Sequence, residues 1–154
     1  MSREQQWLEW AAKLDFDTHA AIKIGGNYVA VLRDGAQVYV SGQIPRLLDT
    51  VVVTGRAGED VTLGQAQYAA RVCAMRALSL LRQELGSLDA VQQVLRISVY
   101  VQSAADFTLQ SEVADAASGV LFEVLGAAGR HTRTSVGVYQ LPKNATVELD
   151  LAAE

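Results

Sequence analysis

Apolar residues recur along this chain with two different periods, and these periods divide it into helices and strands. Two long stretches, residues 62–86 and 107–126, repeat apolar residues at helical spacing, and a shorter amphipathic stretch covers residues 2–14. Alternating or β-branched runs predict strands at residues 28–32, 37–41, 91–103, 134–139 and 146–151, with a further short one near residues 49–55. The predicted order is helix, two or three strands, helix, strand, helix, two strands.

Polar residues and glycines mark the ends of these elements. Each predicted helix begins with Ser or Thr followed three residues later by Gln or Asp, which is capping-box spacing: Ser2 and Gln5, Thr62 and Gln65, Ser103 and Asp106. Gly86 and Gly126 are placed to end the two long helices. Asp34 and Gly35 predict a tight hairpin between the first two strands.

Strands interrupted by two long helices predict an α/β two-layer sandwich. Both long helices should cover one face of a mixed sheet, with the N-terminal helix as an addition. The other face also carries apolar residues, so we expect further copies of the chain to cover it. The 154 residues suit one domain, 1–154, with the N-terminal helix and its lead-in at 1–24 and the core at 25–154.

Composition and charge narrow the classes of function. With 50% hydrophobic and 19% charged residues, the chain falls in the globular range. A net charge of -4 and scattered basic residues argue against a nucleic-acid-binding surface. No apolar run approaches the roughly 18 residues that would span a bilayer, and the first residues lack the pattern of a signal peptide. We therefore expect a cytoplasmic protein with neither a nucleic-acid nor a membrane partner.

The residues that most often ligate metals or act as nucleophiles offer little here. Cys73 is the one cysteine, which suits a reducing compartment, and its place on an apolar helix face indicates packing. His19 and His131 have no second ligand at metal-binding spacing. No metal site is expected.

Three segments resemble one known family. GNYV at 26–29, YVSGQIP at 39–45 and GRHTRTSVGVYQLPKNATVELD at 129–150 are similar, in order and spacing, to motifs of the YjgF/YER/UK family, also called the RidA or reactive intermediate deaminase family. The resemblance implies a chorismate-mutase-like fold and a homotrimer with clefts between its subunits. It also implies hydrolysis of 2-imino acids and enamines to 2-keto acids and ammonia, with no cofactor.

The same resemblance assigns roles to individual residues. Arg133 matches the arginine that grips the substrate carboxylate, and Glu148 matches the acidic residue associated with the water. Tyr28 and the SGQ segment at 41–43 match positions that line the substrate pocket, and Ser41 and Gly42 are the substrate-binding candidates within that segment. Arg133 and Glu148 are thus the candidate catalytic residues, with Arg133 also binding the substrate.

These residue types suit that chemistry. A guanidinium can hold a carboxylate through two charge-assisted hydrogen bonds, and a carboxylate can deprotonate a water as a general base. Backbone N–H groups at Thr134 and Ser135 are candidates to bind the second carboxylate oxygen. Because imines hydrolyse in water unaided, positioning supplies most of what catalysis requires.

The residues alone leave other interpretations open. Arg133 is equally suited to a surface position or an interface ion pair, and alternation along 146–151 makes Glu148 a solvent-facing carboxylate. Asp150 shares the Glu148 face, where its charge would perturb the pKa of Glu148, and is otherwise structural. If the last two strands form a hairpin with Gly137 opposite Glu148, Arg133 lies about 13 Å from Glu148.

The motifs also depart from the best-known branch of the family. Ser135 stands where cysteine is frequent, Gly137 where glutamate is common, and Gln140 where arginine is usual. With the N-terminal helix and a long loop at 46–61, the chain resembles a longer, divergent branch. Two alternatives to deaminase therefore stand: a non-catalytic trimer that binds small carboxylates as a sensor or partner module, and an endoribonuclease, which the acidic charge disfavours.

Overall fold

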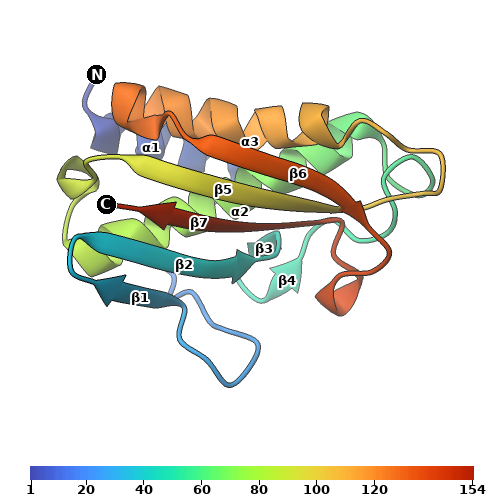
Figure 1. Cartoon of the computed structure of the whole chain (residues 1–154), viewed down its shortest axis with the longest axis horizontal. Coiled ribbons are helices and arrows are strands. Elements are labelled where there is room, and N and C mark those ends of the chain that lie inside the picture. Colours follow the sequence, from blue (N-terminus) through green and yellow to red (C-terminus); the bar gives the residue numbers. More distant parts are fainter.

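The computed structural model describes residues 1–154, and it has two layers (Figure 1). A five-stranded sheet forms one layer, and three α-helices pack together on one of its faces. The helices are α1 (Arg3–Leu14), α2 (Leu63–Leu85) and α3 (Gln110–Leu125), and three short 3-10 turns are η1 (Leu88–Ala90), η2 (Gly126–Gly129) and η3 (Pro142–Asn144). The predicted α/β sandwich with an additional N-terminal helix is confirmed.

The sheet is mixed, with the order β1-β2-β7-β5-β6. Its strands are β1 (Val31–Asp34), β2 (Gln37–Gln43), β5 (Val94–Gln102), β6 (Thr132–Val138) and β7 (Val147–Ala153). Only β5 and β6 are parallel, and α3 provides the crossover that parallel neighbours need. The short strand predicted after β2 is instead a small separate hairpin of β3 (Arg46–Leu47) and β4 (Thr50–Val51).

The last two strands do not pair with each other, so the predicted hairpin is wrong. Strand β5 lies between them, antiparallel to β7 and parallel to β6. Gly137 is therefore level with Val101 of β5, and Val101 in turn with Val147. The predicted hairpin failed because the η3 turn spans one strand width to reach the far side of β5, as Figure 1 shows at one end of the sheet.

Local capping signals set most helix boundaries. Both predicted capping boxes form at α1 and α2, and Gly86 ends α2 with φ of 86°. The third signal is wrong, because α3 begins at Gln110 without a side-chain cap. Ser103 instead pairs with the loop before α2 through an isolated bridge to Ala57, and its hydroxyl donates to the Val101 carbonyl. This anchored turn delays the start of the helix.

One hydrophobic cluster fills the space between sheet and helices. Inward-facing residues of the two central strands are fully buried: Ile97, Val99, Val101, Val147 and Leu149. Helix α1 closes the end of this cluster with Trp7, whose exposed fraction is 0%. Arg82 of α2 holds α1 in place through an ion pair with Glu4, with 2.6 Å between Nη2 and Oε1.

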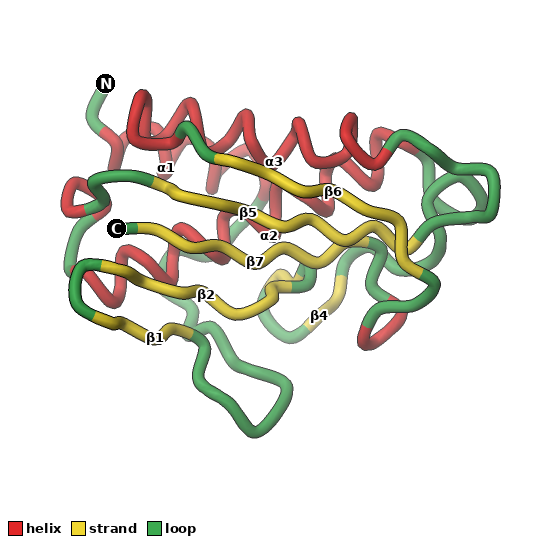
Figure 2. Tube along the Cα trace, viewed as in Figure 1, coloured by secondary structure: helices red, strands yellow, loops and turns green.

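The other face of the sheet carries no helix. Leu32, Tyr39 and Val136 point away from the core there, and each is more than two-fifths exposed. Figure 2 shows the long loop between α1 and β1 extending past the edge strand β1, away from the helices. None of the three helices combines the length and apolar character needed to cross a bilayer.

Candidate functional site

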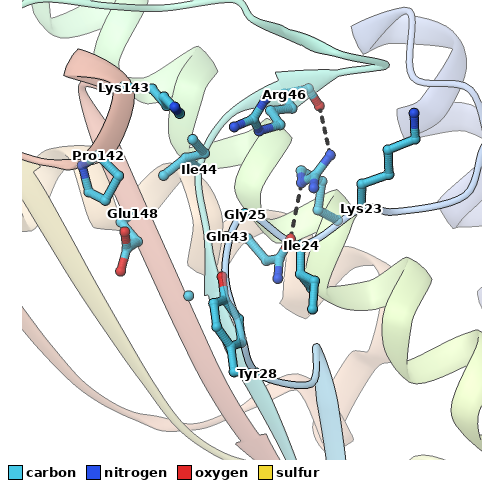
Figure 3. A pocket seen from close by; sticks show the side chains of 12 residues that line it. Lys23, Ile24, Gly25, Tyr28, Gln43, Ile44, Arg46, Pro142, Lys143 and Glu148 are labelled. Carbon is cyan, nitrogen blue, oxygen red and sulfur yellow. Dashed lines mark hydrogen bonds between the residues drawn. The ribbon is translucent and has the colours of Figure 1, made fainter.

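A cavity of about 200 Å³ opens where β2 ends. Its walls come from the loop after α1, the end of β2, one side chain of α2, the η3 turn and the start of β7. Figure 3 shows Glu148 and Lys143 on one side of it and Lys23 on the other. Segments far apart in sequence thus meet at one end of the sheet.

A β-bulge in β2 gives this cavity its shape. Val40 is level with Leu151 of β7, but Gln43 is level with Leu149, so β2 contains one residue more than β7 over that interval. Because side chains alternate between faces, one extra residue reverses the facing of those that follow. Gln43 therefore points into the helix layer, where it is buried and its Oε1 accepts a hydrogen bond of 3.1 Å from Nε of Arg76.

Glu148 lies on the face of the sheet opposite the helices and is half-buried in the cavity wall. Its carboxylate packs against the backbone of Gly42, where an added Cβ would lie 2.9 Å from Cδ of Glu148. Burial raises the pKa of Glu148 above its ordinary value, and the nearby charge of Asp150 raises it further. A carboxylate in this setting holds a proton more readily than one in water.

Basic side chains dominate the rest of the lining. Arg76 is buried, Arg46 is half-buried, and Lys23 and Lys143 are exposed. Lys23 also forms a solvent-exposed ion pair of 3.4 Å with Asp49. With Glu148 as the one acidic residue in the lining, the cavity is electropositive although the chain as a whole is acidic.

Arg133 lies on the opposite face of the sheet from Glu148. Strand β6 places it level with Ile97, on the helix side, where Nη1 binds Oδ1 of Asp115 at 2.8 Å. The same guanidinium donates to the hydroxyls of Ser118 and Ser111, at 3.1 and 2.9 Å. Within one protomer, therefore, Arg133 is bound to α3 and does not reach the Glu148 cavity.

The remaining predicted residues divide between the cavity and other positions. Tyr28 and Gly42 line the cavity with Glu148, although Tyr28 belongs to the loop before β1 rather than to a strand. Ser41 does not line it, and its hydroxyl donates to the Ala30 carbonyl. Thr134 accepts a hydrogen bond from Arg96 on the uncovered face.

Ser135 faces the helix layer next to Val99 and is likewise outside the cavity. The structure thus brings together Tyr28, Gly42 and Glu148, and leaves the Arg133 segment apart from them.

The sequence did not indicate Arg76, and it indicated Gln43, which does line the cavity, only as part of the SGQ segment. Gln43 is part of the SGQ motif, but its direction depends on a bulge that alternation does not reveal. Arg76 was detectable, because a charged residue three positions after Cys73 falls on the buried stripe of the helix. A basic residue on such a stripe requires a polar partner.

Metal and thiol chemistry receive no support from the clusters present. No group of three or more His, Cys, Asp and Glu side chains is arranged to hold a metal ion. Cys73 is fully buried, and burial raises the pKa of its thiol far above the ordinary value. The thiol therefore stays protonated and packs in the core, as its position in the helix predicted.

Comparisons with known proteins place this geometry in a family. Residues 9–154 match the family model described as "YjgF/chorismate_mutase-like, putative endoribonuclease". Protein TCP17 of Trypanosoma cruzi is 41% identical over 143 residues, covering 92% of this chain and 89% of that protein.

Two solved structures are similar over nearly their whole length. The protein Atu1372 of unknown function from Agrobacterium tumefaciens is 35% identical with a TM-score of 0.87, covering 99% of this chain and 95% of that one. A "putative endoribonuclease" from Shewanella oneidensis MR-1 is 26% identical with a TM-score of 0.90, covering 100% and 99%. The chain therefore belongs to the YjgF family, with its chorismate-mutase-like fold, as the sequence motifs predicted.

Proposed function

We propose that the protein hydrolyses reactive 2-imino acids and enamines to 2-keto acids and ammonia, without a cofactor. The observation that carries the proposal is the setting of Glu148. It is a half-buried carboxylate with a raised pKa, held against a glycine in an electropositive cavity that Tyr28 also lines. A raised pKa brings a carboxylate nearer to the value that suits a general base at neutral pH.

In the proposed reaction the imine reacts in its N-protonated form, and Glu148 takes a proton from a water molecule as the oxygen attacks the C=N carbon. The C=N π electrons move to nitrogen, giving a neutral tetrahedral amino alcohol, and Glu148 passes its proton to that nitrogen. As the C–N bond breaks, the electrons of the hydroxyl O–H bond form the C=O bond of the 2-keto acid. Glu148 takes the hydroxyl proton and passes it to the departing ammonia, which leaves as ammonium. One water is consumed and Glu148 returns to its starting state. The electropositive lining draws the anionic substrate toward the cavity.

Arg133 joins this proposal as a residue of a neighbouring subunit. The exposed apolar side chains on the uncovered face, including Leu32, Tyr39 and Val136, support burial of that face in a homotrimer. In such an assembly the Arg133 segment of one subunit would lie beside the Glu148 cavity of the next. The carboxylate of the substrate would then compete with Asp115 for the guanidinium.

The test generates 2-imino acids in place with an amino-acid oxidase and follows their loss. Wild type should accelerate the loss, whereas Arg133→Ala and Glu148→Ala should be slow. Glu148→Gln is the matched variant, because it keeps the size of the side chain and removes the base. A wild-type rate no faster than buffer alone would end the proposal.

A second candidate is a trimer that binds small carboxylates without turning them over. Four basic side chains around one cavity favour it, because anion binding needs only those groups. Binding that is retained in Glu148→Ala, together with no hydrolysis by wild type, would select this function. Endoribonuclease activity, which the family description names, ranks third because the chain is acidic and its basic residues do not form an extended stripe. Salt-sensitive RNA cleavage by metal-free protein would reverse that ranking.

A further inference from the structure

Arg76 is a buried cation without an acidic partner. Its exposed fraction is 5%, and none of the three ion pairs of the chain includes it. Its two hydrogen bonds go to neutral acceptors: Nε donates to Oε1 of Gln43 at 3.1 Å, and Nη1 donates to the Arg46 carbonyl at 3.4 Å. Buried charges in proteins are normally paired, so this arrangement lacks a negative group.

The free end of Arg76 is accessible from the cavity. Nη2 of Arg76 makes no hydrogen bond. Among the side-chain nitrogen and oxygen atoms that solvent cannot reach, Nε1 of Trp7 is the one that lacks a hydrogen-bond partner. Nη2 is therefore not enclosed, and Arg76 lines the same cavity as Glu148. Gln43 fixes the orientation of the guanidinium, because the bulge in β2 points its side chain at Nε of Arg76.

The charges around Arg76 add to the need for an anion. Arg46 and Lys143 line the same cavity, and Glu148 is the one acidic side chain there. Burial lowers the pKa of Arg76, with a smaller lowering from Arg46, so the positive charges oppose one another. An anion bound among them would relieve that repulsion. Glu148 can balance one of the three positive charges of Arg46, Arg76 and Lys143, which leaves two unbalanced. The cavity is therefore suited to a ligand with more than one negative charge.

We propose that Arg76, oriented by Gln43 and assisted by Arg46 and Lys143, is an anion-binding site that selects small molecules with two carboxylate groups. One carboxylate binds Nη2 of Arg76 inside the protomer. The second lies toward the mouth of the cavity, where Arg133 of a neighbouring subunit would meet it. That last step rests on the proposed function, whereas the Arg76 site does not. The favoured substrates are imines whose side chain ends in an acid.

Calorimetric titration of the intact protein at low ionic strength tests the binding site directly. The probes are 2-oxoglutarate and 2-oxohexanoate, which has a chain of similar length without the second carboxylate. Wild type should bind 2-oxoglutarate at least about tenfold more tightly, the gain expected from hydrogen bonds to a charged group. Arg76→Gln should remove this preference. Arg71→Gln is the matched control, because Arg71 is on the same helix and outside the cavity.

A second variant keeps the test valid if Arg76→Gln does not fold. Arg46→Gln changes a side chain that is only half-buried, and it should reduce the preference for 2-oxoglutarate while preserving the thermal transition. Equal binding of the two probes by wild type, no binding of 2-oxoglutarate at millimolar concentration, or a preference unchanged in folded Arg76→Gln would overturn the site.

Kinetics then separate this inference from the proposed function. Imines made from glutamate and from leucine by their oxidases are compared by kcat/KM. A dicarboxylate preference in binding without turnover of either imine means that the Arg76 site stands and the deaminase proposal fails. Turnover of both imines with equal kcat/KM, and no preference in binding, means that the deaminase proposal stands and the Arg76 site fails.

Discussion

Arg133 and Glu148 lie on opposite faces of one sheet, on strands that β5 separates. Arg133 is level with Ile97 of β5 and faces α3, while Glu148 is level with Tyr100 and faces away from the helices. A single protomer therefore cannot use both on one small substrate. If both act in one reaction, each site must combine residues from two subunits.

Intersubunit complementation tests that requirement. Arg133→Ala and Glu148→Gln should each be nearly inactive alone. When the two variants are co-expressed, each mixed trimer contains one interface in three with both residues intact, so about a third of wild-type activity should return. The measurement is imine loss by purified mixed trimers carrying two different affinity tags. Mixed trimers as inactive as the single variants would show that the two residues do not share a site across subunits.

Gly42 should be required for activity more than for folding. A Cβ at residue 42 would lie 2.9 Å from Cδ of Glu148, and the atoms it meets belong to a side chain that can move. In Gly42→Ala the carboxylate should be displaced, so kcat should fall at least about tenfold, which is the effect expected from misplacing a catalytic group. Thermal unfolding should change little.

Gly25→Ala is the matched control for that substitution. Gly25 lines the same cavity, and an added Cβ there meets no atom within 4 Å. Its activity should stay close to that of wild type. Equal activity in the Gly42 and Gly25 variants would contradict the placement of the Glu148 carboxylate.

The pH dependence of hydrolysis should report the ionisation of Glu148. As a general base Glu148 must be deprotonated, so kcat/KM should rise with pH through its raised pKa. The charge of Asp150 contributes to the raised pKa of Glu148. Asp150→Asn should therefore lower this pKa and move the acidic limb of the kcat/KM profile to lower pH. Initial rates between pH 4 and 8 measure this. An acidic limb that stays in place, or moves to higher pH, would contradict the effect of the Asp150 charge on Glu148.

The same raised pKa has a consequence for stability. Because the folded state binds the Glu148 proton more tightly than the unfolded state does, this contribution to stability is present below the unfolded pKa and is lost as pH rises through the folded pKa. Glu148→Gln removes the ionisation. Its Tm should exceed that of wild type at pH 7, with a smaller difference at pH 4. Differential scanning calorimetry at the two pH values checks this, and a lower Tm for the variant at pH 7 would contradict it.

Short-range signals in the sequence predicted the layers but not the neighbours of each strand. The capping boxes at Ser2 and Thr62 and the end of α2 at Gly86 were predictable because each depends on a few adjacent residues. The insertion of β5 between β6 and β7 was not, because strand order depends on contacts between distant segments.

The same limit applied to the candidate site. The motifs identified Tyr28, Gly42 and Glu148, which the structure places around one cavity. They did not indicate that Arg133 faces the helices, since its direction follows from the register with β5. Arg76 was missed although its position on a buried helix stripe carried a signal, and Gln43 was indicated as part of the SGQ segment without its direction, which depends on the bulge.

Helix α1 should stabilise the core without taking part in chemistry. Trp7 is fully buried, and it packs edge-on against Phe16 with 6.4 Å between ring centroids. Trp7→Ala should lower the free energy of unfolding by about 3–5 kcal/mol, the usual cost of such a cavity. Trp7→Phe should cost much less, because it keeps most of the ring and removes Nε1, which is enclosed without a hydrogen-bond partner.

Urea denaturation of both variants measures these costs, and hydrolysis at a temperature where each is folded measures function. We expect kcat close to the wild-type value in both variants, because neither Trp7 nor its neighbour Phe16 lines the Glu148 cavity. A Phe variant as unstable as the Ala variant would show that the indole N–H has a partner within the assembled protein. A folded variant with a strongly reduced kcat would instead connect α1 to the site.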